Sequence, residues 1–83
     1  MRRIIRLDKI IDILKGIRPE FDFTASDDFI NDGFIDSFDI VTLVAALEKQ
    51  FGIKIKGTEI VPENFCNLNA IAALLKKYGA AIA

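Results

Sequence analysis

The chain reads Asp32-Gly33-Phe34-Ile35-Asp36-Ser37-Phe38-Asp39 at the point where a turn-rich segment gives way to a helical pattern. The apolar residues that follow recur at three- and four-residue steps, which predicts a helix from Asp36 or Ser37 to Phe51. Its buried face would comprise Ile40, Leu43, Val44, Leu47 and Phe51. Asp36 can cap the first turn, and Gly52 is well placed as the left-handed residue that ends the helix.

The segment before this helix is turn-rich, but it also contains large apolar side chains. No helical period holds from Glu20 to Asp36, and the run from Ser26 to Gly33 is dense in turn formers. The apolar residues of this segment are Phe21, Phe23, Phe29, Phe34 and Ile35. We therefore expect an ordered loop that is held against the core, and ordered loops of this length usually serve function.

Two further helices are predicted from the same kind of pattern. Ile4 to Ile17 forms an amphipathic repeat of Ile4, Leu7, Ile11 and Leu14, which Ile10 and Ile17 widen. The last helix is expected from Leu68 to Tyr78, with Asn67 as its cap. Its inward-facing residues would be Leu68, Ile71, Ala72, Leu75 and Tyr78. Between the two helices, residues 53–56 suggest an extended connector, and Thr58 to Phe65 allows one short, irregular helical turn around Pro62. The sequence thus predicts an all-α chain in which residues 1–83 form one domain.

The composition limits the chemistry that this chain can perform. Its 83 residues are 52% apolar, which is enough for a small core but leaves little room for an enclosed active site. There is no histidine, and Cys66 is the single cysteine. These absences exclude Ser-His-Asp and Cys-His nucleophiles, the usual zinc sites and an intrachain disulfide. We predict a protein that is not an enzyme, with no catalytic residue and no resident metal.

The charge is unevenly distributed although the net charge is only -1. Residues 20–39 contain seven acidic side chains and no basic one. Such a segment repels phosphate backbones, so nucleic-acid binding is not expected, and it would suit a partner with a basic patch. The sequence contains no apolar run of membrane-spanning length and no signal-peptide pattern at its start. We expect a cytoplasmic monomer without a membrane span.

Ser37 is the residue whose position suggests function. A hydroxyl at a helix start lies beside backbone amides that lack partners, and these amides favour an attached phosphate group. A nucleophilic serine needs an adjacent base, and Asp36 is a poor one because the reference pKa of an aspartate is about 3.9. Ser37 therefore suggests a site that another enzyme modifies.

Residues 33–39, followed by an apolar helix that ends Leu47-Glu48-Lys49-Gln50-Phe51-Gly52-Ile53, resemble the acyl carrier protein family. That family has an Asp-Ser-Leu signature at the start of its second helix, preceded by a Gly-x-x pattern. The resemblance extends over most of the chain. It implies an acyl-carrier-like four-helix bundle with three longer helices, one short helix and a long loop between the first and second.

The resemblance also implies a cofactor, a modification site and partners. A phosphopantetheinyl transferase would move 4'-phosphopantetheine from coenzyme A onto Ser37, and Asp36 would help to bind magnesium during the transfer. The arm would hold acyl or aminoacyl cargo as a thioester. A loading enzyme and downstream acyltransferases or synthases of fatty acid or specialised lipid biosynthesis would read a surface formed by Phe38, Val41, Ala45 and Glu48.

Two departures from the family pattern bear on the cargo. Carriers of fatty-acid synthesis usually have several glutamates along the second helix, whereas this chain has Thr42 and Lys49 among the exposed positions and only Glu48 in the later turns. Recognition by the standard fatty-acid enzymes is therefore not expected. Phe38 replaces the signature leucine, which resembles the D-alanyl carrier proteins and some carriers of specialised pathways.

Three other interpretations remain open at this level. The chain can be an unmodified helical interaction module that docks through Phe38, Val41 and Ala45. Cys66 can be a reactive thiol, although a lone cysteine near a helix start is more often a small apolar residue. The acidic segment also resembles part of an EF-hand calcium loop, because positions 1, 5, 6, 9 and 12 of such a loop would be Asp28, Asp32, Gly33, Asp36 and Asp39.

Overall fold

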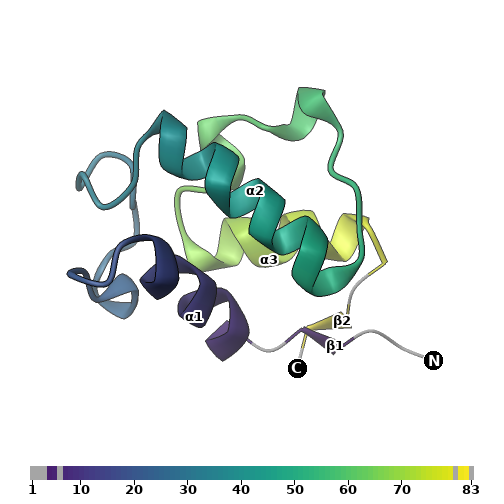
Figure 1. Cartoon of the computed structure of the whole chain (residues 1–83), viewed down its shortest axis with the longest axis horizontal. Helices are drawn as coiled ribbons and strands as arrows, with labels where there is room; N and C mark the ends of the chain where they lie inside the picture. Colours follow the sequence, from purple (N-terminus) through teal and green to yellow (C-terminus); the bar gives the residue numbers. More distant parts are fainter. Residues whose placement is uncertain (1–3, 6, 80, 83) are drawn as a thin grey trace.

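The computed structural model contains three α-helices that enclose one hydrophobic core (Figure 1). It describes residues 4–5, 7–79 and 81–82. Helix α1 spans Leu7–Ile17, α2 spans Ser37–Phe51 and α3 spans Leu68–Lys77. The predicted helical class and the long loop between the first two helices are confirmed. None of the helices in the described ranges is long and apolar enough to cross a membrane.

The short fourth helix is not confirmed, although the structure is compatible with it. Two 3-10 turns lie in this stretch instead, η2 at Gly57–Glu59 and η3 at Pro62–Asn64. Pro62 begins η3, and the Phe65 amide donates to the Pro62 carbonyl at 3.0 Å to close it. Residues 53–56 form the predicted extended connector, which buries Ile55 and half-buries Ile53.

The start of the first helix was predicted wrongly. Ile4–Ile5 form a short strand, β1, which pairs in parallel with β2 at Ala81–Ile82. The pairing joins segments from opposite ends of the sequence, so the local pattern gave no sign of it (Figure 1). The buried face of α1 is also turned, since Ile10 and Leu14 are fully buried while Ile11 is only half-buried. The inward face of α1 is therefore formed by Leu7, Ile10, Leu14 and Ile17, which occupy a narrower sector of the helix than the full predicted stripe.

Helices α2 and α3 bury nearly the residues that their spacing predicts. Ile40, Leu43, Val44 and Leu47 of α2 are buried, and Phe51 is half-buried. Gly52 ends the helix in the left-handed conformation at φ 62°. Asn67 caps α3 by accepting from the Ala70 amide at 2.7 Å. The buried face of α3 also includes Leu74, which the predicted stripe omitted.

The loop between α1 and α2 is held by phenylalanine rings, as predicted. Phe23 and Phe29 are buried and meet edge to face at 5.0 Å between ring centroids. Phe34 stacks on Phe21 at 4.5 Å. The backbone of Phe29 joins the loop to the region before α3, because its amide donates to the Cys66 carbonyl at 2.6 Å. The 3-10 turn η1, Phe23–Ala25, lies within the same loop.

If these rings hold the loop, deleting one of them should lower the free energy of unfolding as much as deleting a core side chain does. We expect Phe29→Ala to lower the free energy of unfolding by about 3–5 kcal/mol, the usual cost of deleting a buried ring. Phe38→Ala is the matched control, because Phe38 is 82% exposed. Its loss should change the free energy of unfolding by less than about 0.5 kcal/mol. Denaturant unfolding of both variants measures the difference. Equal effects would contradict the assigned role of the loop.

Candidate functional site

Ser37 is the first residue of α2 and its side chain is exposed. In the described part of the chain its hydroxyl makes no hydrogen bond. The sequence has one other serine, Ser26, which is only 9% exposed and donates to Asp32 Oδ2 at 2.5 Å. Of the two serine hydroxyls, only that of Ser37 is accessible to a modifying enzyme.

A reciprocal capping box fixes the backbone on both sides of Ser37. Asp36 Oδ1 accepts from the Asp39 amide, and Asp39 Oδ2 accepts from the Asp36 amide, both at 3.0 Å. The cap leaves the first two helical amides, those of Ser37 and Phe38, without carbonyl partners in the helix. These amides and the helix dipole favour an anion at this end. The exposed hydroxyl and the amides beside it therefore fit a phosphodiester on Ser37.

Arg18 links this cap to the end of α1. Its Nε donates to Asp39 Oδ2 at 2.9 Å, and its Nη2 lies 2.9 Å from the same oxygen. Nη2 also lies 3.5 Å from Asp36 Oδ2, and Nη1 lies 3.8 Å from Glu20 Oε2. This contact could not be predicted from local pattern, because residues 18 and 39 are 21 positions apart and share no periodicity.

The contact with Arg18 keeps Asp39 ionised. Burial raises the pKa of the Asp39 carboxyl, but the hydrogen bond from Arg18, the backbone hydrogen bond of Asp36 and the positive charge of Arg18 outweigh it. The pKa of Asp39 therefore lies below its ordinary value. The same hydrogen bond and the negative charge of Asp39 raise the pKa of Arg18.

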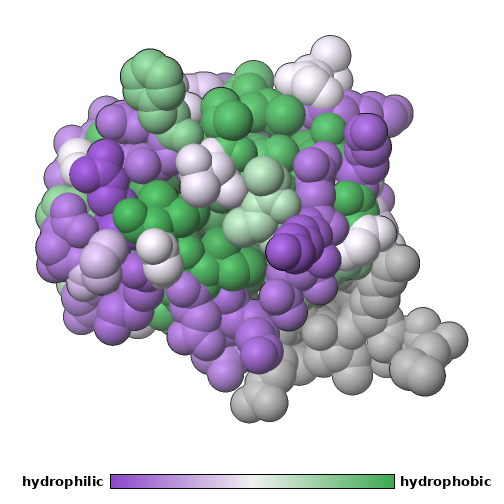
Figure 2. All heavy atoms as spheres, in the orientation of Figure 1, coloured by the Kyte–Doolittle hydropathy of each residue, from purple (hydrophilic) through white to green (hydrophobic). Residues whose placement is uncertain are grey.

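An apolar surface continues from Ser37 along the exposed side of α2. Phe38 is 82% exposed and Val41 65%, and Ala45 is also exposed, one turn further on. Figure 2 shows hydrophobic residues gathered on the face of the molecule over this helix. Glu48, predicted for the same surface, is half-buried, and its Oε2 accepts from the Ile55 amide at 2.9 Å. One oxygen of the Glu48 carboxylate therefore holds the extended connector of residues 53–56 in place.

The acidic residues of the loop do not converge as calcium ligands would. Asp28 accepts from the backbone and side-chain amides of Asn31, and Asp32 accepts from Ser26. Asp36 and Asp39 are engaged in the cap. Across residues 7–79, no group of three or more acidic, histidine or cysteine side chains is placed to hold a metal ion. The structure therefore gives the EF-hand interpretation no support.

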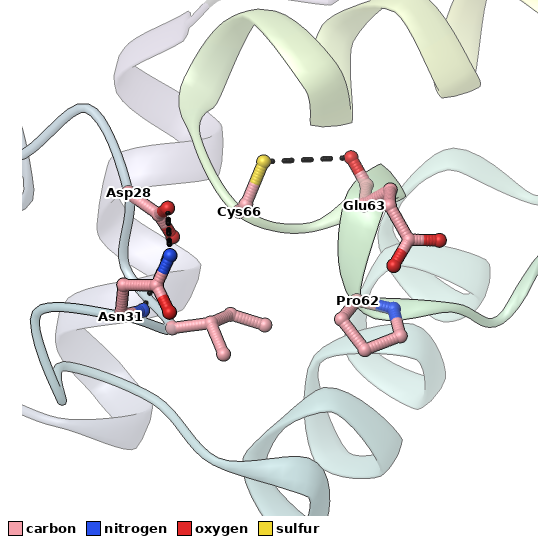
Figure 3. A pocket seen from close by; sticks show the side chains of 6 residues that line it. Asp28, Asn31, Pro62, Glu63 and Cys66 are labelled. Carbon is pink, nitrogen blue, oxygen red and sulfur yellow. Dashed lines mark hydrogen bonds between the residues drawn. The ribbon is translucent and has the colours of Figure 1, made fainter.

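Cys66 lines a pocket of about 280 Å³ between the loop and η3, together with Asp28, Ile30, Asn31, Pro62 and Glu63 (Figure 3). The cysteine is half-buried, and its thiol donates to the Glu63 carbonyl at 3.4 Å. This contact is local and structural. It gives no support to a reactive thiol.

The pKa of Asp39 predicts how its contribution to stability depends on pH. Because the folded pKa is lowered, the stabilisation is complete above the unfolded pKa of about 3.9 and is lost as the pH falls through the folded value. We expect Asp39→Asn to lower the free energy of unfolding by roughly 1–3 kcal/mol at pH 7. The gap from the wild type should narrow below about pH 4.

Urea unfolding from pH 7 down to acid pH measures this gap. Asp27→Asn is the control, because Asp27 is exposed and its carboxylate makes no hydrogen bond among the described residues. A gap for Asp39→Asn that stays constant with pH would show that its carboxylate is not the stabilising group.

Comparison with protein families bears directly on this site. The family model described as "phosphopantetheine attachment site" matches residues 8–75, which include all of α2 and most of α1 and α3. Comparisons with curated proteins and with solved structures give no significant match. Members of the family carry cargo on a covalently attached 4'-phosphopantetheine and do not catalyse its chemistry, which confirms the predicted cofactor and non-catalytic role. The chain therefore belongs to the family of carrier proteins that contain a phosphopantetheine attachment site.

Proposed function

We propose that the 4'-phosphopantetheine arm is attached to Ser37 and that the chain presents acyl or aminoacyl cargo, bound to the arm as a thioester, to partner enzymes. The observation that carries this proposal is the exposed hydroxyl of Ser37 at the capped start of α2, which makes no hydrogen bond to any residue that the structure describes. The first-turn amides beside it favour the negative charge of a phosphodiester. The buried, hydrogen-bonded Ser26 offers no comparable position.

The attachment reaction divides between this chain and a transferase. The Ser37 oxygen forms a bond to the phosphorus of the pantetheine phosphate while the pyrophosphate bond of coenzyme A breaks, and 3',5'-adenosine bisphosphate leaves. The hydroxyl proton passes to a base of the transferase, because this chain has no histidine beside Ser37. Asp36 would assist by helping to bind magnesium during the transfer. Its Oδ1 accepts from the Asp39 amide, and its Oδ2 lies 3.5 Å from Arg18 Nη2.

The exposed apolar residues of α2 provide the docking surface for partner enzymes. Phe38 lies next to Ser37, and Val41 and Ala45 follow along the helix, so a partner that covers them also covers the attachment site. Exposed large apolar side chains are a feature of interaction surfaces. Glu48 lies at the edge of this surface, with one of its oxygens directed to the connector.

Intact mass spectrometry tests the attachment site. After incubation with coenzyme A and a broad-specificity phosphopantetheinyl transferase, the wild-type chain should gain the mass of one arm. Ser37→Ala should gain none, and Ser26→Ala, if folded by circular dichroism, should gain the same mass as the wild type. A folded wild type that gains no mass would contradict the proposal and would favour an unmodified interaction module.

The melting temperature distinguishes the two classes of cargo. If an acyl chain enters the core among Val44, Leu47, Ile55, Ile60 and Ile71, it binds only the folded state and stabilises it. We expect the melting temperature of the loaded carrier to rise along a series of lengthening saturated acyl chains, with the empty carrier as reference. A melting temperature that does not change with chain length would contradict acyl storage in the core. It would favour an aminoacyl cargo that stays in solvent.

A further inference from the structure

We propose that Arg18 is a positioning residue for the modification of Ser37 and that it acts through Asp39. This inference rests on the proposed function, in which a transferase modifies Ser37. Arg18 directly follows α1 in the chain and has no place in the local pattern around the serine. The structure nevertheless brings its guanidinium onto both carboxylates of the capping box.

The geometry makes Asp39 the point through which Arg18 acts. Asp39 Oδ2 accepts from Arg18 Nε at 2.9 Å and from the Asp36 amide at 3.0 Å. The second of these bonds holds Asp36 extended, at φ -120° and ψ -173°, immediately before Ser37. A fixed residue 36 fixes the direction of the Cα–Cβ bond of Ser37, which carries the hydroxyl, at the helix start. Arg18 thus orients the serine without contacting it.

The charge distribution makes Arg18 hard to replace. It is the only basic residue between Lys15 and Lys49, a range that contains eight acidic side chains. The Asp39 side chain is 13% exposed, so without Arg18 a largely buried carboxylate would lose its cationic partner. Repulsion from Asp36, which lies in the same cap, would then favour opening of the first turn. Ser37 would sample several orientations, and few of them would suit in-line attack on a phosphorus atom.

The expected effect is on the turnover of the transferase rather than on its affinity for the carrier. Val41 and Ala45 of the docking surface lie beyond the first turn of α2, so they keep their places when Arg18 is removed. We therefore expect Arg18→Gln to reduce kcat for arm transfer about tenfold, which corresponds to about 1.4 kcal/mol of barrier, and to leave KM within about twofold. Arg18→Lys should recover part of the lost kcat, because a lysine supplies the positive charge but not the planar guanidinium group with its several N–H donors.

A double-mutant cycle tests whether the effect passes through Asp39. The four chains are the wild type, Arg18→Gln, Asp39→Asn and the double variant, each assayed by the rate of mass gain with coenzyme A and transferase. We expect the double variant to be no slower than the slower single variant, because both substitutions break the same link. If the loss of kcat in the double variant is instead the product of the two single losses, about a hundredfold when each is about tenfold, Arg18 acts independently of Asp39. That result would overturn the inference.

Lys77→Gln is the matched control. It removes the same charge and also breaks one ion pair, since Lys77 Nζ lies 3.4 Å from Glu59 Oε2, but this pair joins α3 to η2. Its kcat should equal that of the wild type. All assays are run at a temperature where circular dichroism shows each variant folded, and Arg18→Lys replaces Arg18→Gln in the cycle if the latter does not fold.

The possible failures are distinguishable. A wild type that gains no arm contradicts the proposed function itself. A wild type that is modified, together with an Arg18→Gln variant modified at the same rate, contradicts only the role of Arg18. A loss of equal size in Lys77→Gln would assign the effect to overall charge and would also overturn the inference.

Discussion

The link between Arg18 and Asp39 is the interaction on which the functional end of this molecule depends. It joins the end of α1 to the start of α2 across a loop of 19 residues, and it supplies a positive charge to a cap built from two carboxylates. Without that charge, the capping box would place two acidic side chains together at a partly buried helix start. With it, the first turn of α2 is fixed while Ser37 and Phe38 stay exposed. The same end of the helix is thus rigid in its backbone and accessible in its side chains.

The two faces of α2 have different tasks. The helix is held in the core by the buried residues Ile40, Leu43, Val44 and Leu47. Phe38 and Val41 remain exposed, although full burial of one such side chain would stabilise the folded state by about 1.5–3 kcal/mol. In a domain of this size that is a large share of the total stability. The exposed apolar residues lie directly beside the serine, which is consistent with a surface kept for partners. The phenylalanines of the loop have the opposite role, since they turn inward and hold a long irregular segment against the core.

The sequence predicted the features that follow from local pattern. The capping residue Asp36, the ending residue Gly52 and the buried stripe of α2 all follow from spacing and residue type, and the structure confirms each of them. The inward phenylalanines of the loop could also be inferred from their density. Contacts between distant segments could not. The Arg18 link, the pairing of β1 with β2 and the bond from Glu48 to the Ile55 amide each join residues that no periodicity relates.

Fragmentation of the modified chain by tandem mass spectrometry shows directly whether the arm is attached to Ser37. The measurement locates the added group on a single side chain, so it separates Ser37 from Ser26, from the threonines and from Cys66. We expect fragment ions that place the phosphopantetheine on Ser37 alone. An arm found on any other residue would contradict attachment at Ser37.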